Sequence, residues 1–136
     1  MRLVRRAPKA DGELRWDPDA GSIDRAALVA LKPRAFIHLS GENVGDGRWT
    51  DARKRILVES RTRSTRLLAE AIAALDPKPA CFVSASAIGI YGTNQNDPVT
   101  ESAPPGDGFL AKLCVDWEAS TEAARTAGIR TVLMRI

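Results

Sequence analysis

Three apolar segments recur along the chain, each preceded by a stretch with helical character, and this alternation restricts the fold more than any other feature. The segments read RAFIHLS (34–40), ACFVSASAIGIYG (80–92) and IRTVLMRI (129–136). They are continuous apolar runs, as expected of strands that are buried on both faces. Because strands that alternate with helices form a parallel sheet, the sequence predicts a doubly wound α/β fold with helices on both faces of the sheet.

Weaker signals complete the order of the elements. Three short elements are expected near the start, namely strands at 2–6 and 13–16 and a helix at 23–31. Thr50 has the residue type of an N-cap for a long helix, which the segment DPKP at 76–79 ends. Asp107 is expected to cap a second helix that runs to about residue 127, where Gly128 would terminate it.

Composition is that of an ordinary globular domain. The 136 residues are 44% apolar and 27% charged, with a formal net charge of +3, which suits one domain with its own core. The mild charge, an aromatic content of 5% and the lack of a recognition motif argue against nucleic-acid binding. No apolar run approaches the ~20 residues of a membrane span and no signal peptide is recognisable, so we expect no membrane partner.

Two cysteines and one histidine bear on metal and redox chemistry. Cys81 lies in an apolar strand and Cys114 on an apolar helix face, without the spacing of a metal site. Cysteines in such surroundings indicate reduced, buried thiols, so we expect a cytoplasmic protein without a bound metal. His38 lies inside a strand and has no partner at ligand spacing, which favours a structural role.

Ligands of open parallel sheets bind beyond the carboxyl ends of the strands, so the loops that follow the strands carry the functional expectations. The first strand ends in Arg5 and Arg6. In a dinucleotide-binding fold, arginine at the end of the second strand accommodates a 2′-phosphate, whereas an acid favours a bare ribose hydroxyl. Two arginines without an acid favour NADP over NAD. The alternative is a pair of solvated surface arginines, and spacing alone does not choose between the two.

The loop LSGENVGDG at 39–47 follows a strand and precedes a helix, as a phosphate-binding loop would. Its glycines have neither the GxxxxGK[ST] nor the GxGxxG spacing, so direct pyrophosphate binding is not expected here. Gly41 is better explained by close backbone approach to a ligand. At the end of the next long strand, Ser84 and Ser86 are either small packing residues or hydroxyls that position a substrate.

Five segments together resemble the extended short-chain dehydrogenase/reductases of the NAD-dependent epimerase/dehydratase superfamily. They read IHLSGEN (37–43), SRTRSTRLLAEAI (60–72), FVSASAIGIYG (82–92), GDGFLAKLCVDWEAS (106–120) and VLMRI (132–136). More narrowly, SGENVGDGRWTDARKRILVESR and PPGDGFLAKLCVDWE resemble the atypical, sugar-nucleotide-epimerase-like branch, whose substrate is unassigned. The resemblance covers nearly the whole chain. It implies an NAD(P)-binding Rossmann fold, with NADP favoured and NAD as the alternative.

The resemblance also implies which residues bind the cofactor. They are Arg5, Arg6, Leu39, Ser40, Gly41 and Arg61. The first two occupy the family's 2′-phosphate position, and the next three match a strand end whose backbone lines the cofactor. Arg61 stands where ordinary extended members have a helix asparagine, in a Ser-Arg pair typical of the narrower branch.

Among the catalytic residues, the resemblance implies Ser86 as the active-site hydroxyl, but the Tyr-x-x-x-Lys motif is missing. The aligned positions hold Leu110 and Cys114. In the family's chemistry the tyrosine transfers a proton, and the lysine lowers its pKa and holds the ribose; leucine can do neither. Cys114 is a weak acid, although its apolar helix face favours a buried structural thiol. Tyr91, the only tyrosine, lies at a strand–loop junction and is the other substitute acid.

A second departure concerns parts of the family fold that this sequence does not contain. The glycine-rich first strand and helix, which bind the pyrophosphate, would precede Arg2, and the substrate-binding region would follow Ile136. We therefore expect residues 1–136 to form a partial Rossmann domain. It is either a fragment or a chain whose sheet closes, swaps or forms a homodimer. Because the missing strand is central, we expect a gap between the strands at 2–6 and 34–40, and weak or no NADP binding by the chain alone.

Three functions stay open from the sequence. The first is an NADP-dependent oxidoreductase or epimerase-like enzyme that transfers hydride at a hydroxyl or carbonyl carbon of a small molecule. Ser86 would bond the reacting oxygen, and Tyr91, Cys114 or a water would supply the proton. The second is a non-catalytic NADP-binding or sensing module, which the missing motif would allow. The third is an inactive, truncated gene product.

Overall fold

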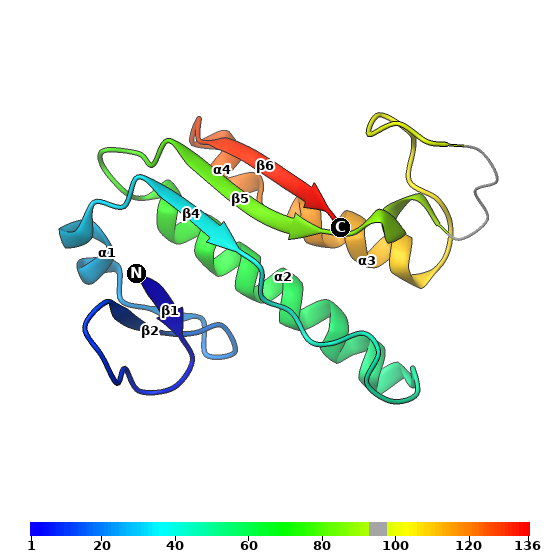
Figure 1. Cartoon of the computed structure of the whole chain (residues 1–136), viewed down its shortest axis with the longest axis horizontal. Coiled ribbons are helices and arrows are strands. Elements are labelled where there is room, and N and C mark those ends of the chain that lie inside the picture. The colour runs from blue at the N-terminus through cyan, green and yellow to red at the C-terminus, as the bar shows by residue number, and fades with distance from the viewer. Residues whose placement is uncertain (93–97) are drawn as a thin grey trace.

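The computed structural model of the chain describes residues 1–92 and 98–136, and its strands form two separate sheets (Figure 1). The first sheet has the order β1 (Arg2–Val4), β2 (Glu13–Asp17) and β3 (Ser22–Ile23). The second has the order β4 (Ala35–His38), β5 (Cys81–Ser86) and β6 (Arg130–Arg135). All neighbouring strands run parallel except β3, which is antiparallel to β2 and was not predicted. The predicted parallel α/β sheet is therefore confirmed.

The helices follow the predicted order. They are α1 (Arg25–Leu31), α2 (Asp51–Ala73), a short 3-10 helix η1 (Ile88–Tyr91), α3 (Phe109–Ala119) and α4 (Glu122–Thr126). Thr50 caps α2 as predicted, because its hydroxyl accepts a hydrogen bond of 3.2 Å from the backbone N–H of Arg53. The polar segment TNQNDPVTESAPPGDG (93–108), whose prolines and glycines predict a loop, falls in part on residues 93–97, which lie outside the described residues.

The helix predicted from Asp107 to about residue 127 is in fact two helices. The N-cap of α3 is Gly108, without a side-chain cap, so the prediction that Asp107 caps this helix was wrong. Helix α3 ends at Ala119 because the hydroxyls of Ser120 and Thr121 donate to carbonyls of its last turn at 2.8 and 2.7 Å. Hydroxyls that bond backward in this way satisfy carbonyls that a continuing helix would otherwise use.

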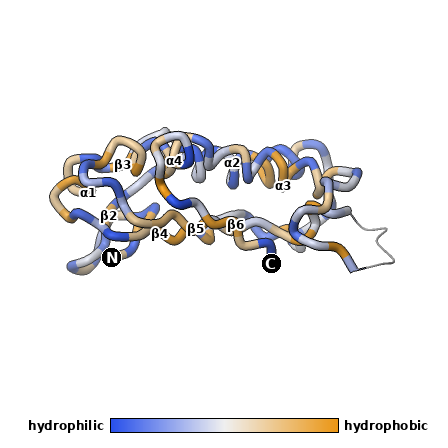
Figure 2. The backbone as a smooth tube through the Cα atoms, turned by 90° about the horizontal axis from the view of Figure 1, so that it is seen from above, coloured by the Kyte–Doolittle hydropathy of each residue, from blue (hydrophilic) through white to orange (hydrophobic). Residues whose placement is uncertain are grey.

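The described helices gather on one side of the second sheet (Figure 2). Right-handed crossovers that all lead in one direction place their helices on a single face, and the order β4–β5–β6 is such a case. Phe36 on the helix side is 9% exposed, whereas the next residue, Ile37, is 69% exposed. Ile37 is in register with Val83, and Val83 with Val132. We call these three residues the bare face of the sheet. Within the described part of the chain, helices thus cover one face of the sheet and not the expected two.

Helix α2 packs against both sheets. The main core draws residues from β2, α1, β4, α2, β5 and α4, and its members include Trp16, Leu28, Phe36, Leu68, Ile72 and Phe82. A second cluster joins the first half of α2 to the end of β5, η1 and α3. The core therefore lies between the long helix and the strands, and it bridges the two sheets.

The expected gap between the first strand and the central strand is present. β1 and β4 are each the last strand of their sheet, and a cavity of about 520 Å³ lies between them. Leu3 lines the cavity from β1, and Phe36 and Ile37 line it from β4. Strand edges in this position carry backbone groups without a neighbouring strand.

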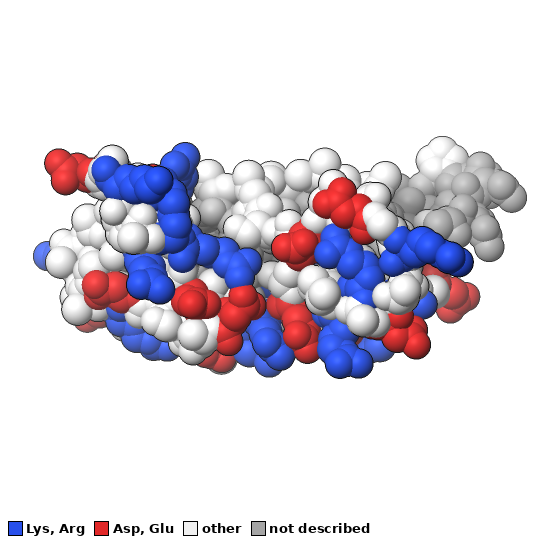
Figure 3. All heavy atoms as spheres, turned by 90° about the horizontal axis from the view of Figure 1, so that it is seen from below, with Lys and Arg blue, Asp and Glu red and all other residues white. Residues whose placement is uncertain are grey.

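Charged side chains of both signs are interspersed over the face shown in Figure 3. Some of the described ions pair along one helix, as Arg63 and Glu59 do at 3.2 Å. None of the helices in residues 1–92 and 98–136 combines the length and the apolar character that a membrane span requires.

We predict that the bare face mediates self-association, because the exposed Ile37 and the partly exposed Val83 and Val132 lie side by side in one plane. The substitution Ile37→Lys should shift the chain toward monomer in sedimentation velocity. It should change the free energy of unfolding by no more than about 0.5 kcal/mol, since Ile37 is largely exposed. Ile56→Lys on α2, where the side chain is 48% exposed, is the matched control and should leave the sedimentation unchanged. A wild-type chain that stays monomeric at high concentration would contradict this prediction.

Candidate functional site

A cavity of about 280 Å³ lies where β1 and β4 end, and we call it the strand-end cavity. Four of the six residues predicted to bind a cofactor line it, namely Arg5, Leu39, Ser40 and Gly41. Arg5 follows a strand of the first sheet, and the other three follow a strand of the second. The two sheets therefore form opposite walls of the cavity.

The two arginines after β1 are engaged in different ion pairs. Arg5 pairs with Asp19, another residue of the strand-end cavity, and both side chains are more than half exposed. Arg6 donates two hydrogen bonds of 2.7 Å to the Glu13 carboxylate and does not line the cavity. The hydrogen bonds from Arg6, followed by the bond from the backbone N–H of Lys9, lower the pKa of Glu13 to about 2. An exposed ion pair held by a single hydrogen bond contributes little to stability. Arg5 can therefore leave Asp19 for a more tightly bound anion more readily than Arg6 can leave Glu13.

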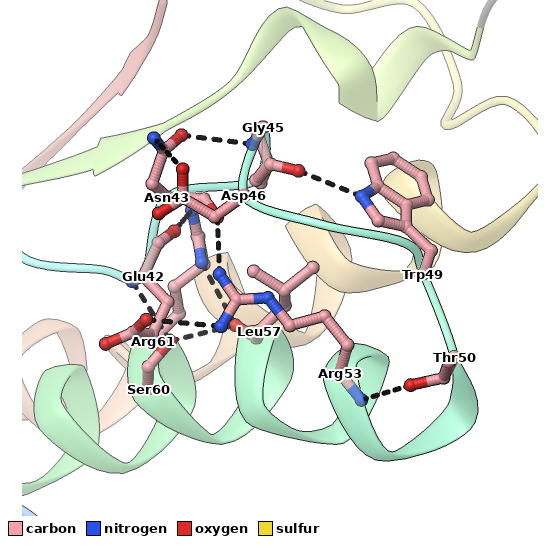
Figure 4. Close-up of polar contacts among 11 residues, drawn as sticks. Glu42, Asn43, Gly45, Asp46, Trp49, Thr50, Arg53, Leu57, Ser60 and Arg61 are labelled. Atoms are coloured by element: carbon pink, nitrogen blue, oxygen red, sulfur yellow. Dashed lines mark hydrogen bonds and ion pairs between the residues drawn. The ribbon is translucent and has the colours of Figure 1, made fainter.

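The glycine-containing loop after β4 is tied to α2 by two arginines (Figure 4). Arg53 donates to the carbonyl of Asn43 at 2.7 Å, and Arg61 donates to the carbonyl of Glu42 at 2.9 Å. Within the loop, the Gly45 N–H donates to the Asn43 side chain at 3.0 Å. The loop is thus a fixed connection between β4 and α2. Its carbonyls at Glu42 and Asn43 accept hydrogen bonds from α2, and the expectation that the loop does not bind pyrophosphate stays a prediction.

Arg61 lies beneath the strand end and does not line the strand-end cavity. Its guanidinium is 5.1 Å from the ring centroid of Trp117 and donates to the carbonyl of Leu57 at 3.1 Å. Burial lowers the pKa of Arg61. A Cβ atom at Gly41 would lie 3.1 Å from the Arg61 Cζ atom, so the close approach expected at Gly41 is made by this side chain. In the structure Arg61 supports the cavity wall, and direct contact with a cofactor stays a prediction.

His38 belongs to the core beside the strand-end cavity. It is 3% exposed, its Nε2 atom lies 3.1 Å from the Ser64 hydroxyl oxygen, and the Trp16 ring packs edge-on against it at 5.7 Å between centroids. Burial lowers the pKa of His38 to about 4. The imidazole is therefore neutral near pH 7, which suits the structural role expected from the sequence.

A second cluster of polar side chains joins the ends of β5 and β6, and we call it the Ser86–Arg135 network. The Ser86 hydroxyl donates to Glu118 Oε1 at 2.5 Å. Arg135 donates to both oxygens of the same carboxylate, from Nε at 2.8 Å and from Nη2 at 2.9 Å. Its Nη1 atom donates to the Tyr91 hydroxyl oxygen at 2.7 Å and to the carbonyl of Glu101 at 2.8 Å. Two predicted catalytic residues, Ser86 and Tyr91, are thereby connected.

The charges of this network reinforce each other. Burial raises the pKa of Glu118, but the hydrogen bonds from Arg135 and Ser86 lower it by more, and the net shift is downward. The bond to Glu118, followed by the bond to Tyr91, raises the pKa of Arg135. At neutral pH the network therefore contains a carboxylate and a guanidinium that face each other in a bidentate pair.

A larger cavity of about 1000 Å³ opens beside the network, and we call it the β5–β6 cavity. Tyr91 and Arg135 line it together with Ile88, Leu133 and Met134. Such a mixture of apolar walls and a few convergent polar groups is typical of small-molecule sites.

Cys114, the third predicted catalytic residue, lies apart from both cavities. It is 2% exposed and packs in the cluster with Leu57, Leu113 and Trp117. Burial, followed by the negative charge of Glu118, raises the pKa of its thiol. The arrangement matches the buried structural thiol that the helix face indicated. Across residues 1–92 and 98–136, no three histidine, cysteine or acidic side chains are grouped so that they could hold a metal ion.

Glu118 and Arg135 were not among the residues predicted from the sequence. Arg135 carried one usable signal, because it interrupts the apolar run VLMRI at a carboxyl strand end. In the parallel register it pairs with Ser86, so the two side chains leave the sheet on the same face. Glu118 lies one helical turn after Cys114, and no spacing in the sequence links it to Arg135.

Cavities at the carboxyl ends of parallel strands, one lined by an arginine after β1, define a Rossmann-like ligand-binding domain. Comparison with known proteins narrows this class. The model of the NAD dependent epimerase/dehydratase family matches residues 17–136, and the chain belongs to that family.

Relatives of similar sequence are longer than this chain. An epimerase family protein of Mycobacterium bovis is 42% identical over 135 residues, which cover 99% of the chain and 44% of the relative. The human epimerase family protein SDR39U1 is 31% identical over 132 residues, which cover 95% of the chain and 42% of the relative. The chain therefore spans less than half the length of these relatives.

Solved structures agree with the fold. The nucleoside-diphosphate sugar epimerase of Corynebacterium glutamicum superposes with a TM-score of 0.79 at 36% identity, over 98% of this chain and 27% of that one. The structure of human SDR39U1 isoform 2 with NADPH gives a TM-score of 0.75 at 24% identity, over 98% of this chain and 43% of that one. The partial Rossmann class expected from the sequence is thus confirmed.

We predict that stability falls between pH 7 and pH 5 because of His38, the single histidine. Its pKa is about 4 when folded and 6.5 ordinarily, so the unfolded chain binds a proton first as the pH falls through 6.5. The stabilisation by neutral His38 is present above pH 6.5 and is lost toward pH 4, by about 2 kcal/mol at pH 5. Denaturant unfolding at the two pH values measures the loss.

The variant His38→Gln is the control for this prediction. Glutamine has no charge to gain, so its free energy of unfolding should vary much less over the same range. Glu13 and Glu118, whose pKa values are lowered, titrate below this window and do not interfere. Equal stability of the wild-type chain at pH 7 and pH 5 would show that the His38 pKa is not depressed.

Proposed function

We propose that the chain is part of an NADP-dependent oxidoreductase or epimerase-like enzyme and carries the edge of the sheet where the cofactor binds and the reaction takes place. The reaction would be hydride transfer at a hydroxyl or carbonyl carbon of a small molecule. One observation carries the proposal: the strand-end cavity with Arg5 and the Ser86–Tyr91 pair both lie at carboxyl strand ends of one parallel α/β domain. The family membership and the NADPH in the human relative's structure support it.

The residues of the strand-end cavity fit the adenosine end of such a cofactor. Arg5 provides a cation for a 2′-phosphate, and the backbone from Leu39 to Gly41 provides a wall. The sequence contains no GxGxxG segment for the pyrophosphate. NAD is the alternative cofactor, since the Bacillus cereus UDP-glucuronic acid 4-epimerase, whose fold is similar, was solved with NAD. When bound, the cofactor would supply or accept the hydride.

We propose that Ser86, which is 4% exposed and lines neither cavity, accepts a hydrogen bond from a substrate. Its own hydrogen is donated to Glu118, which leaves the lone pairs of the hydroxyl oxygen toward other groups. A substrate hydroxyl can donate to these lone pairs, whereas a substrate carbonyl has no hydrogen to donate. The observed bond therefore suits an alcohol substrate, and a carbonyl substrate would be bonded once the Ser86 hydroxyl turns from Glu118 and donates to the carbonyl oxygen.

Tyr91 is the better proton donor of the two predicted substitutes. Tyr91 lines the β5–β6 cavity, and its hydroxyl oxygen is 2.7 Å from a guanidinium nitrogen of Arg135. Cys114 is buried away from the cavity, and burial raises the pKa of its thiol. We therefore assign proton transfer to Tyr91.

We predict that Arg5 selects a 2′-phosphate. Calorimetry should show that 2′,5′-ADP binds about tenfold more tightly than 5′-AMP, as expected for a charge-assisted bond to a phosphate. Arg5→Ala should abolish this preference. Arg6→Ala is the matched control and should retain it, since Arg6 is engaged with Glu13 outside the cavity. Equal affinity for the two nucleotides would contradict the assignment of NADP.

We predict that Ser86→Ala lowers the rate of hydride transfer at saturating NADPH, a condition that matters because weak cofactor binding is expected of the chain alone. NADPH oxidation is followed at 340 nm with a panel of aldehydes and ketones, and Ser86→Ala should lower the rate about 100-fold through loss of a bond to the reacting oxygen. Ser84→Ala on the same strand is the control, because the Ser84 hydroxyl donates to the backbone carbonyl of Ala85 and takes no part in the Ser86–Arg135 network. If NADPH binds and no member of the panel is reduced, the chain would instead be a cofactor-binding module.

A further inference from the structure

The Ser86–Arg135 network is built from four separate segments of the chain. Ser86 ends β5, Tyr91 ends η1, Glu118 lies in α3 and Arg135 ends β6. Every link between them is a direct hydrogen bond of 2.5 to 2.9 Å. The four side chains therefore form one continuous chain of bonds from the Ser86 hydroxyl to the Tyr91 hydroxyl.

The central pair of this chain is well shielded and geometrically restricted. The side chains of Arg135 and Glu118 are 21% and 12% exposed. A bidentate pair between a guanidinium and a carboxylate fixes the plane of both groups. Arg135 is further fixed by the Glu101 carbonyl and lies over the Tyr91 ring, 5.3 Å from its centroid.

The Arg135–Glu118 pair can be compared with the lysine of the missing Tyr-x-x-x-Lys motif. The lysine of a Tyr-x-x-x-Lys motif would place a cation beside the catalytic phenol, and Cys114 at the aligned position has no such charge. Arg135 reaches the phenol of Tyr91 from the neighbouring strand. Glu118, one turn after Cys114 on the same helix, holds that cation in place.

We propose that Glu118 and Arg135 are positioning residues that fix Ser86 and Tyr91 relative to each other, with Arg135 providing the cation beside Tyr91 that lysine provides elsewhere. The catalytic consequence rests on the proposed function, whereas the coupling of Glu118 to Tyr91 does not. A buried ion pair is weak evidence of a contribution to stability, so stabilisation alone does not explain this bidentate geometry. The exposed pair of Arg125 and Glu122 on α4, at 3.9 Å, offers the same charges without the network.

The coupling can be measured without any substrate, because Tyr91 is the only tyrosine of the chain. Labelling with 3-fluorotyrosine gives a single ¹⁹F resonance that reports on this ring. Glu118→Gln should shift this resonance by more than its linewidth, because glutamine loses the ionic bidentate pair and releases Arg135. Arg135→Met should shift it as well. The matched control Glu122→Gln should leave it in place.

The result that overturns the proposal is a wild-type resonance position in folded Glu118→Gln, with folding checked by circular dichroism. Arg135→Lys keeps the charge and loses the planar fork, so its resonance should lie between those of the wild type and Arg135→Met. A resonance of Arg135→Lys equal to that of Arg135→Met would refute the role of the cation. If Arg135→Met does not fold, Glu118→Gln and Arg135→Lys decide the question alone.

Measurement of enzymatic turnover provides a second test of the positioning role. In the NADPH assay Glu118→Gln should lower kcat at least tenfold with little change in KM, since misplacement of Ser86 and Tyr91 affects the reacting geometry more than binding. An increase in KM alone would refute the positioning role. If no variant and no wild-type sample shows turnover, the proposed function fails, while the ¹⁹F result still decides whether Glu118 and Tyr91 are coupled.

Discussion

The packing of α2 against both sheets is the interaction on which the rest of the structure depends. The strands of the described chain form two sheets whose edges do not pair, so side chains must connect them. Leu68 and Ile72 of α2 lie in one core with Trp16 from the first sheet and Phe36 and Phe82 from the second. Burial of such side chains contributes roughly 1.5–3 kcal/mol each relative to exposure. The helix therefore sets the distance across which the two walls of the strand-end cavity face each other.

The sequence predicted those parts of the fold whose signals are local. The apolar runs gave the parallel strands, and Thr50 gave the start of α2, because both depend on a few adjacent residues. The break between α3 and α4 was missed, because Ser120 and Thr121 act through backward hydrogen bonds in a segment that otherwise has helical character. Strand β3 was missed because two residues are too few for a periodic signal.

The candidate site shows the same limit at the level of single side chains. Arg5, Arg6 and Arg61 were all predicted to bind a cofactor, yet their partners differ: a carboxylate at the cavity, a bidentate carboxylate outside it, and backbone carbonyls beneath an aromatic ring. Residue type and strand position do not specify these partners. The link between Glu118 and Arg135 joins a helix to a strand across 17 residues, so only the tertiary structure could place them together.

The two-walled construction of the strand-end cavity has a consequence for the energetics of the whole chain. Arg5 and Trp16 contribute to it from one sheet, and Leu39 and Gly41 from the other. A small molecule that touches both walls would act as a non-covalent cross-link across a boundary that has no backbone pairing of its own. Its binding would add RT ln(1 + [L]/Kd) to the free energy that holds the two sheets in their relative positions. Ligand binding in the cavity and packing of the two sheets would then be coupled, so that any change that stabilises this packing also raises the affinity of the cavity for its ligand.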